Sequence, residues 1–253
     1  MKVRTITVGL ALEPQDFVEI DGSHAISLKL QFAKKSLDDI SNSLKSSGYE
    51  VQTLRISLNS FEDWLLHDNQ GNRTEYEIAA YVSLIEVLVH YLTLYSIELC
   101  AIGCCSSSHA ISLIPSLLAV SGRLSASALF SGNNSHDISP DDVPIKAAAR
   151  TLIAVAKTLG VEGCFRYCAS FNCAGGLPFF PAAFYEHHSA NDSFDKDAAV
   201  KEGFMVSIGL ECADLLFIAF HGASSASEGS SQYHSNSPNE LFLTAPMTVN
   251  TFS

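Results

Sequence analysis

The chain lacks a long apolar run and a cleavable leader. Its most apolar segment is interrupted by Glu86 and His90, so no run approaches the roughly 18 to 20 apolar residues that a membrane span needs. The N-terminal stretch MKVRTITVGLALEPQDF is interrupted by Thr5 and Thr7, and no small-residue cleavage site follows it. These absences predict a soluble, cytoplasmic protein without a membrane partner.

Positive charge is also scarce. Lys and Arg number 15 against 27 Asp and Glu in 253 residues, which gives a formal net charge of −12. Nucleic-acid affinity rests mainly on Lys and Arg side chains that neutralise phosphates, so we exclude nucleic acid as the main partner and expect a small-molecule ligand. Because 47% of the residues are hydrophobic and only 17% charged, part of the apolar surface could be covered in a homo-oligomer.

Paired zinc-binding motifs are missing, although cysteine is not. The seven cysteines are Cys100, Cys104, Cys105, Cys164, Cys168, Cys173 and Cys212. An odd number in a chain without a leader predicts reduced thiols. The Cys164, Cys168 and Cys173 spacing lacks the second half of a structural zinc site, and no sequence feature identifies a cofactor.

Apolar, β-branched runs alternate with segments of helical periodicity along most of the chain. Strands are predicted at residues 2–10, 49–57, 97–104, 123–132, 164–171 and 203–210, and helices at 25–47, from Thr74 onward, at 106–122, at 140–160 and from Glu211 to Phe220. Because helices connect nearly all the strands, the pattern predicts an α/β fold with a mainly parallel sheet. The near-continuous apolar strands predict a sheet covered on both faces.

Capping residues mark the predicted helix starts. Thr74 with Glu77 and Ser139 with Asp142 form capping-box patterns. The serines of GCCSSSHA, before the helix at 106–122, are interpreted as caps, although Cys104 and His109 there would also fit a thiol and base. Beyond Gly222 the Ser-rich sequence loses its periodicity, so we predict one α/β domain at 1–221 and a disordered or atypical tail at 222–253.

Several of these segments resemble one known family. KVRTITVGLAL, AIGCCSSSHAISLIPSLL, RLSASA, FRYCASFNCAGGLPFFPAAFYEHH and SIGLECADLLFIAF, in this order over residues 1–221, are similar to the DUF711 (UPF0210) family of uncharacterised proteins. The resemblance implies a fold similar to the barrel of pyruvate formate-lyase-like glycyl radical enzymes, without an assigned activity. Family members are longer, so it also implies a C-terminally truncated barrel.

The segment SFNCAGGLPFFPAAFYEHH carries the candidate chemistry. Cys173 follows a predicted strand end, where parallel α/β folds place their binding loops. Its thiol could act as a nucleophile or radical carrier, with His187 or His188 as base and Glu186 orienting the imidazole. The structural alternative is a cysteine packed as a small hydrophobe.

Two further hypotheses concern ligands near this segment. His187 and His188 could bind a metal with Glu186 and with Asp192 or Asp195, although a solvated turn is the simpler interpretation. Asn172 and the Gly175–Gly176 turn could present backbone N–H groups to an anion.

Arg4 in the first strand must pair with an acid such as Glu211 or reach a ligand. The leading hypothesis is a metabolite-binding, enzyme-like domain with a strand-end pocket around Cys173. The alternative is a non-catalytic truncated scaffold.

Overall fold

The computed structural model describes residues 2–20, 23–66, 75–130, 143–171, 173, 177–185, 204–213 and 217. One compact unit, Lys2–Glu211, contains every helix and strand bounded below. The other unit comprises Met1 and Cys212–Ser253, and only residues 212, 213 and 217 of it are described.

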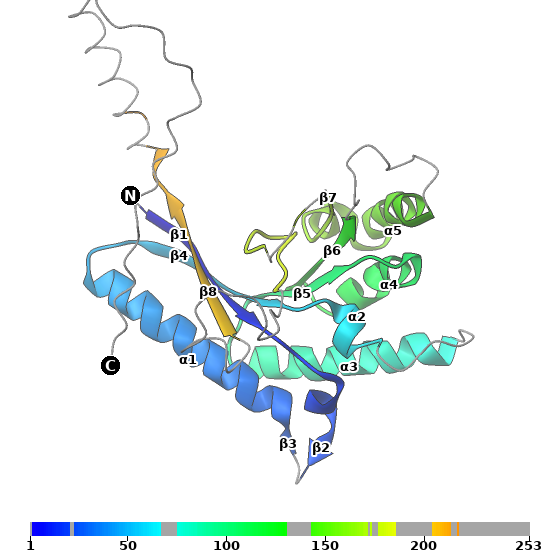
Figure 1. Ribbon diagram of the computed structural model, residues 1–253, viewed down its shortest axis with the longest axis horizontal. Coiled ribbons are helices and arrows are strands. Elements are labelled where there is room, and N and C mark those ends of the chain that lie inside the picture. Colours follow the sequence, from blue (N-terminus) through cyan, green and yellow to red (C-terminus); the bar gives the residue numbers. More distant parts are fainter. Residues whose placement is uncertain are drawn as a thin grey trace, which may run out of the picture. The chain divides into compact units, whose positions relative to one another are not determined.

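A six-stranded sheet forms the centre of the larger unit (Figure 1), in the order β7-β6-β5-β4-β1-β8. Its strands are β1 (Lys2–Leu10), β4 (Val51–Leu58), β5 (Leu99–Cys105), β6 (Leu124–Phe130), β7 (Tyr167–Phe171) and β8 (Phe204–Glu211). The neighbouring pairs from β1 to β7 are parallel, and β8 pairs antiparallel with β1. The predicted α/β class with a mainly parallel sheet is therefore confirmed.

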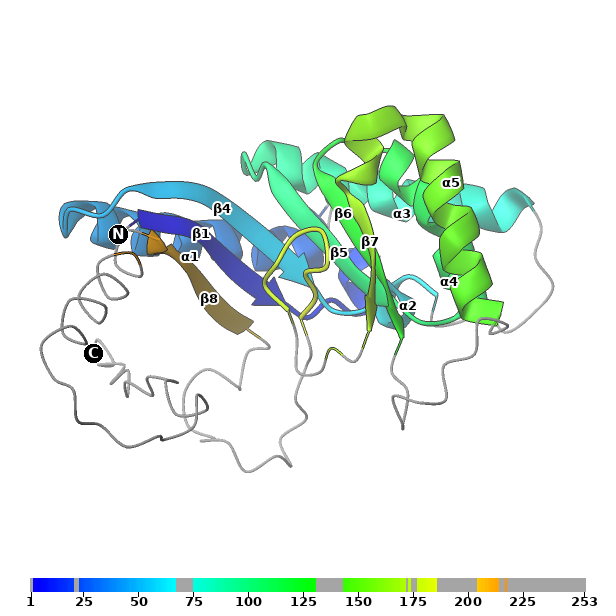
Figure 2. The same cartoon turned by 90° about the horizontal axis from the view of Figure 1, so that it is seen from above.

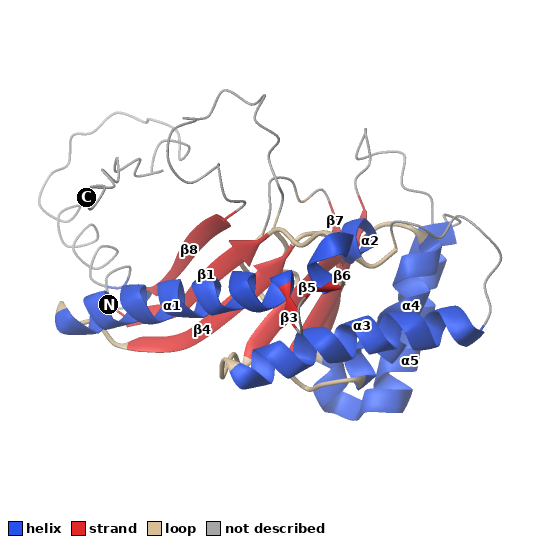
Figure 3. Ribbon diagram, turned by 90° about the horizontal axis from the view of Figure 1, so that it is seen from below, coloured by secondary structure: helices blue, strands red, loops and turns tan. Residues whose placement is uncertain are grey.

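The helices lie on one side of this sheet. They are α1 (Ala25–Ser46), α2 (Phe61–Trp64), α3 (Glu75–Leu94), α4 (Ser108–Ala119) and α5 (Val143–Cys164). Successive parallel strands are added in one direction from β1 to β7, and right-handed crossovers then carry the connecting helices to the same face. Figure 3 shows this arrangement, with the helices in front of the strands.

Apolar periodicity explains how α1 packs. Ile26, Leu30, Ala33 and Leu37 recur at three- and four-residue intervals, and all four are buried. They join a core to which the alternate strand residues Ile6, Val8 and Leu10 contribute from β1. The prediction of this helix is confirmed, and the helix ends at Ser46, one residue before its predicted end. Gly48, with a φ of 86°, follows the last turn and stops the helix.

The serines before α4 are caps, as predicted. The Ser107 hydroxyl accepts a hydrogen bond from the Ala110 backbone N–H at 3.2 Å. The Glu62 carboxylate accepts two more, from the backbone N–H groups of Ser106 at 2.7 Å and Ser107 at 3.1 Å. Glu62 thus occupies the N-terminus of α4, where an anionic ligand could otherwise bind. The caps predicted at Thr74 and Ser139 lie outside the described residues.

Two boundary predictions are wrong. Glu211 does not begin a helix, because it is the last residue of β8 and pairs with Lys2 across the strands. Helix α5 does not end at Gly160. The backbone leaves the helical conformation there, at φ 68° and ψ −162°, and then forms a further turn to Cys164.

Four short elements were not predicted. They are the 3-10 helix η1 (Pro14–Phe17), the hairpin strands β2 (Glu19–Ile20) and β3 (Ser23–His24), and α2. The signal for α2 was present in the sequence, because Ser60 accepts from the Glu62 backbone N–H at 3.2 Å and two acids occupy the first turn.

None of the described helices combines the length and the apolar character that a helix needs to cross a bilayer.

Candidate functional site

The two faces of the sheet differ in chemistry. Side chains of a strand alternate between faces, and the helix-side residues, such as Ile56, Leu124 and Ala126, belong to the hydrophobic core. The opposite face, which we call the helix-free face, carries Thr5, Thr7, Gly9, Arg55, Ser57, Ala101, Cys104, Ser125, Ser127, Cys168 and Ser170. Within the described residues no helix covers this face, yet Thr7, Ser57 and Ser127 are buried there, so the expectation of a sheet covered on both faces holds at these positions without a second layer of helices. The register also places Leu99 and Leu129 on this face.

Strand register arranges these residues in rows. Gly9 is paired with Ser57, Ser57 with Ala101, and Ala101 with Ser125, so one row across four strands consists of small side chains. In a second row, Cys104 is paired with Ser127, and Ser127 with Cys168. Small side chains in adjacent strands leave room for another segment of the chain to pack closely on the sheet.

The segment Leu177–Tyr185, which we call the strap, occupies part of this room. Figure 2 shows it in yellow, on the side of the sheet away from the helices. Leu177 and Phe184 exchange two backbone hydrogen bonds of 2.9 Å, and the Tyr185 N–H donates to the Leu58 carbonyl at the end of β4 at 2.8 Å. The strap is thereby fixed to the carboxyl end of a central strand.

Side chains hold the strap against the helix-free face. The Tyr185 ring packs on Gly9 so closely that a Cβ there would lie 2.5 Å from a ring carbon. The Thr7 hydroxyl donates to the Pro178 carbonyl at 3.4 Å, and the Phe180 ring centroid lies 4.9 Å from Cζ of Arg55. Burial raises the pKa of Tyr185, as expected for a phenol packed against the sheet.

Three polar atoms on the helix-free face are buried without a hydrogen-bond partner among the described residues. They are Ser125 Oγ, Ser127 Oγ and Arg55 Nε. The two serines are 3% and 0% exposed. Buried polar groups are nearly always hydrogen-bonded, so these three groups are exceptions, as are Ser41 Oγ and Arg166 Nε elsewhere in the described residues.

Arg55 differs from the other arginine of this region. Burial and, secondarily, the charge of Arg4 lower the pKa of the Arg55 guanidinium, yet no described acid forms an ion pair with it. Arg4 instead donates to Gln52 at 2.8 Å and lies 3.6 Å from the Glu211 carboxylate. The predicted pairing of Arg4 with Glu211 is thus present, and Arg55 is the cation without an acidic partner.

The structure places Cys173 just beyond the end of β7. The thiol is half-buried and donates to the Phe171 carbonyl at 3.4 Å. Cys168 faces the helix-free side two residues before Ser170, whose hydroxyl lies 3.7 Å from its sulfur. Burial raises the pKa of Cys168, and the charge of Cys173 contributes to that rise.

The other predicted site residues are not brought to Cys173 by the described part of the chain. Arg4 and Glu211 pair at the amino end of β1, and β4, β5 and β6 separate β1 from β7. Four strand spacings correspond to about 19 Å. Asn172, Gly175, Gly176, Glu186, His187, His188, Asp192 and Asp195 lie outside the described residues. Within the described residues, no three His, Cys, Asp or Glu side chains group as metal ligands would.

Sequence reasoning missed the residues of the helix-free face. The signal was the period-two alternation in the strands themselves: TIT in β1, RIS in β4, SAS in β6 and CAS in β7. The interpretation of these strands as near-continuous apolar runs did not take this alternation into account. Arg55 is not among the predicted site residues, although it is a charged residue in the middle of an otherwise uncharged strand.

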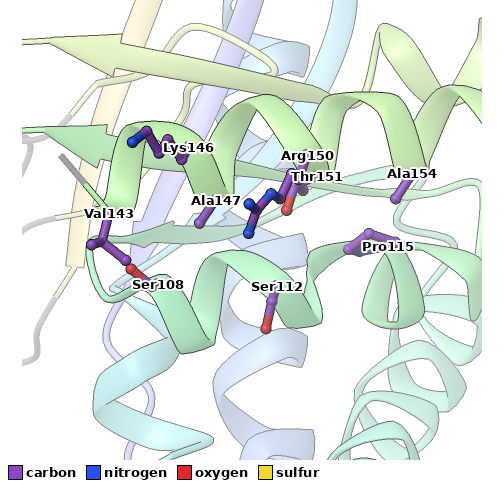
Figure 4. Close-up of a pocket in the computed structure, with 9 residues that line it drawn as sticks. All are labelled: Ser108, Ser112, Pro115, Val143, Lys146, Ala147, Arg150, Thr151 and Ala154. Carbon is purple, nitrogen blue, oxygen red and sulfur yellow. The ribbon is translucent and has the colours of Figure 1, made fainter. Parts of the chain in front are cut away.

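A groove between α4 and α5 forms a cavity (Figure 4). It has a volume of about 520 Å³ and is lined by Ser108, Ser112, Pro115, Val143, Lys146, Ala147, Arg150, Thr151 and Ala154. Two of its hydroxyls are engaged within the protein, since Thr151 donates to the Ile111 carbonyl at 2.9 Å and Ser112 to that of His109 at 2.7 Å. Unlike the helix-free face, the groove therefore has no unpaired buried hydroxyl directed toward a ligand.

Buried thiols predict a loss of stability at alkaline pH. Burial raises the pKa of Cys100 and of Cys105, which are 0% and 1% exposed. Above the unfolded-state thiol pKa of about 8.5, the unfolded chain releases these protons while the folded chain retains them. The free energy of unfolding should therefore fall as the pH rises above about 8.5, by up to about 1.4 kcal/mol per pH unit for each thiol.

Urea unfolding between pH 7 and 10 measures this effect. The variant Cys100→Val removes one titrating group, so its stability should fall less steeply than that of the unchanged protein. Parallel curves for the two proteins would show that the Cys100 thiol does not contribute to the alkaline loss.

Comparison with known proteins identifies one family for this chain. None of the curated proteins matches the chain. A family model described as "Uncharacterised ACR (DUF711)" matches residues 1–236, which extends beyond residue 221, where the resemblance was expected to end. The match covers most of the 253 residues, and the chain therefore belongs to the DUF711 family.

Proposed function

We propose that this protein binds a small polar metabolite on the helix-free face of its sheet, beneath the strap, and that the Cys173 thiol lies at the rim of this site as its reactive group. The observation that carries the proposal is the burial of Ser125 Oγ and Ser127 Oγ without partners. A hydroxyl in such a position loses its hydrogen bonds to water and gains none from the protein. Binding of a polar ligand would restore them.

The position of the site supports the same proposal. Ligands of parallel α/β folds bind at the carboxyl ends of the strands, on loops that the sheet holds in place. The strap is bonded to the end of β4 at Leu58, and Cys173 follows the end of β7. A thiol at this position could attack a bound substrate. The roles of Glu186, His187, Asn172, Gly175 and Gly176 around it remain predictions.

We further propose that the sheet is part of a barrel similar to that of pyruvate formate-lyase-like enzymes. The addition of parallel strands in one direction, with helices on one face and small polar residues on the other, supports this, because barrels place helices outside and ligand-binding residues at the strand ends.

A second candidate function is that of a non-catalytic scaffold that binds another protein. It is favoured by apolar side chains exposed on α5, namely Leu152 at 47%, Ile153 at 54% and Val161 at 77%. Exposed apolar side chains grouped on one element are a feature of protein interfaces.

Alkylation by iodoacetamide at pH 6 to 8, followed by peptide mass analysis, tests the metabolite site. We expect Cys173 to react first and the buried Cys100 and Cys105 last. Addition of small carboxylates, phosphates and polyols should reveal a compound that slows alkylation of Cys173.

Cys164 on α5 is the internal control, because it is also half-buried but lies on a helix. A compound that binds the proposed site should leave its alkylation unchanged. Equal inertness of all seven thiols would refute the proposed reactive role of Cys173. Failure of every compound to protect it would favour the scaffold.

A further inference from the structure

Arg55 provides a positive charge inside the proposed site. Its side chain leaves β4 on the helix-free face and lies against the Phe180 ring of the strap, with Cζ 4.9 Å from the ring centroid. Its Nε is buried without a partner among the described residues, and none of the described acids forms an ion pair with it. A partly buried guanidinium without a counter-ion is unfavourable unless an anion joins it.

The acid that pairs with Arg4 forms no ion pair with Arg55. Glu211 lies on β8 with its carboxylate 3.6 Å from Arg4. Arg4 has a side-chain exposure of 64% and so also remains in contact with water. The chain as a whole carries a net charge of −12, so attraction of an anion to this region must come from a local cation rather than from the surface in general.

The unpaired serine hydroxyls lie on the same face as this cation. Ser57, two residues after Arg55, is paired with Ala101, and Ala101 with Ser125. Two strand spacings and two residues along a strand separate the Arg55 and Ser125 Cα atoms by about 12 Å. Only the small Ala101 side chain lies between Ser57 and Ser125 in that row. The guanidinium can therefore act on the same small molecule as the hydroxyls of Ser125 and Ser127.

We infer that the ligand of this site carries an oxyanion, a carboxylate or a phosphate, that pairs with Arg55 and accepts hydrogen bonds from Ser125 and Ser127. This inference rests on the proposed function and names the chemistry of its ligand. A guanidinium matches carboxylate and phosphate oxygens with two parallel N–H donors, and each serine hydroxyl can donate one bond. The strap supplies the apolar cover, through Phe180 and Tyr185, that keeps water from competing for these bonds.

Thermal unfolding and calorimetric titration of the full chain test the inference. The probes are inorganic phosphate, acetate and succinate, with acetamide and glycerol as neutral counterparts and potassium chloride as the control for ionic strength. We expect at least one oxyanion to raise Tm and to bind the unchanged protein. The Arg55→Gln variant should bind it at least tenfold more weakly.

Arg4→Gln is the matched control, because it removes a guanidinium from the adjacent strand that already has Gln52 and Glu211 as partners. It should retain the oxyanion affinity. Equal oxyanion effects on the unchanged protein and Arg55→Gln would overturn the inference. If the Arg55→Gln variant does not fold, protection of Arg55 from phenylglyoxal by phosphate in the unchanged protein decides instead, and absence of protection counts against the inference.

The neutral probes distinguish the two proposals. Binding of acetamide or glycerol that slows Cys173 alkylation and is unaffected by Arg55→Gln would overturn the oxyanion inference and leave the metabolite site intact. If no charged or neutral probe binds or protects Cys173, both proposals fail.

Discussion

Replacing Gly103 with alanine is expected to lower the free energy of unfolding by about 4 kcal/mol, a large part of the stability of a typical domain. Gly103 has a φ of 93°, in a region that L side chains rarely adopt. A Cβ at this position would lie 2.1 Å from the Asn59 carbonyl oxygen and 2.7 Å from its carbon. Both contacts are to backbone, so no side-chain rotation can relieve them.

The location of Gly103 extends this effect to the proposed site. The pairing between β5 and β6 shifts in register between Ala101 and Cys104, on either side of Gly103. After the shift, Cys104 is paired with Ser127 on the helix-free face, and Cys105 joins the core. Displacement of β5 at Gly103 would therefore move the row that contains Ser127.

Gly48→Ala is the matched control for this prediction. Gly48 also has a positive φ, of 86°, but a Cβ there would meet nothing within 4 Å. Only the backbone conformation then opposes the substitution, at a cost of about 1.5 kcal/mol. Urea unfolding of both variants measures the difference, and equal losses would show that the close approach of β5 to Asn59 is unimportant.

Local sequence patterns were sufficient to predict most helices and strands. Strand β1 was predicted at its observed bounds, Lys2–Leu10, and α1 ends one residue before its prediction, at Ser46. Ser107 was predicted as a cap and is one. These features depend on neighbours in sequence, where periodicity and capping residues act directly.

The arrangement of the candidate site could not be predicted in the same way. That Ser57, Ala101 and Ser125 share a row depends on the register between strands distant in sequence. The Arg4–Glu211 pair was predicted because a guanidinium in an apolar strand needs a partner, yet it lies at the amino end of β1, away from Cys173. Local periodicity shows which face a residue occupies within its own strand, whereas tertiary pairing decides which residues meet.

The second large effect is expected from removing the two unpaired hydroxyls together. In the ligand-free protein, Ser125 Oγ and Ser127 Oγ are desolvated and bond to no described group, and each such group costs roughly 1 to 3 kcal/mol. The double variant Ser125→Ala and Ser127→Ala should therefore be more stable than the unchanged protein by about 2 kcal/mol. It should also bind an oxyanion about a hundredfold more weakly, because two hydrogen bonds to a charged group are lost.

Thr151→Val supplies the opposite case. Thr151 is buried like the two serines, but its hydroxyl donates to the Ile111 carbonyl at 2.9 Å. Removing a paired hydroxyl should lower the free energy of unfolding by about 1 kcal/mol. Comparison of the double serine variant with Thr151→Val thus distinguishes hydroxyls that stabilise the fold from hydroxyls that are available to a ligand.

The most direct test of the helix-free face as a binding site is urea unfolding of the Ser125→Ala and Ser127→Ala double variant, with and without inorganic phosphate. The ligand-site account predicts a free energy of unfolding above that of the unchanged protein without phosphate, and little or no further gain when phosphate is added. A variant that is less stable than the unchanged protein, and that phosphate stabilises as strongly, would contradict it, because the serines would then serve the fold rather than a ligand.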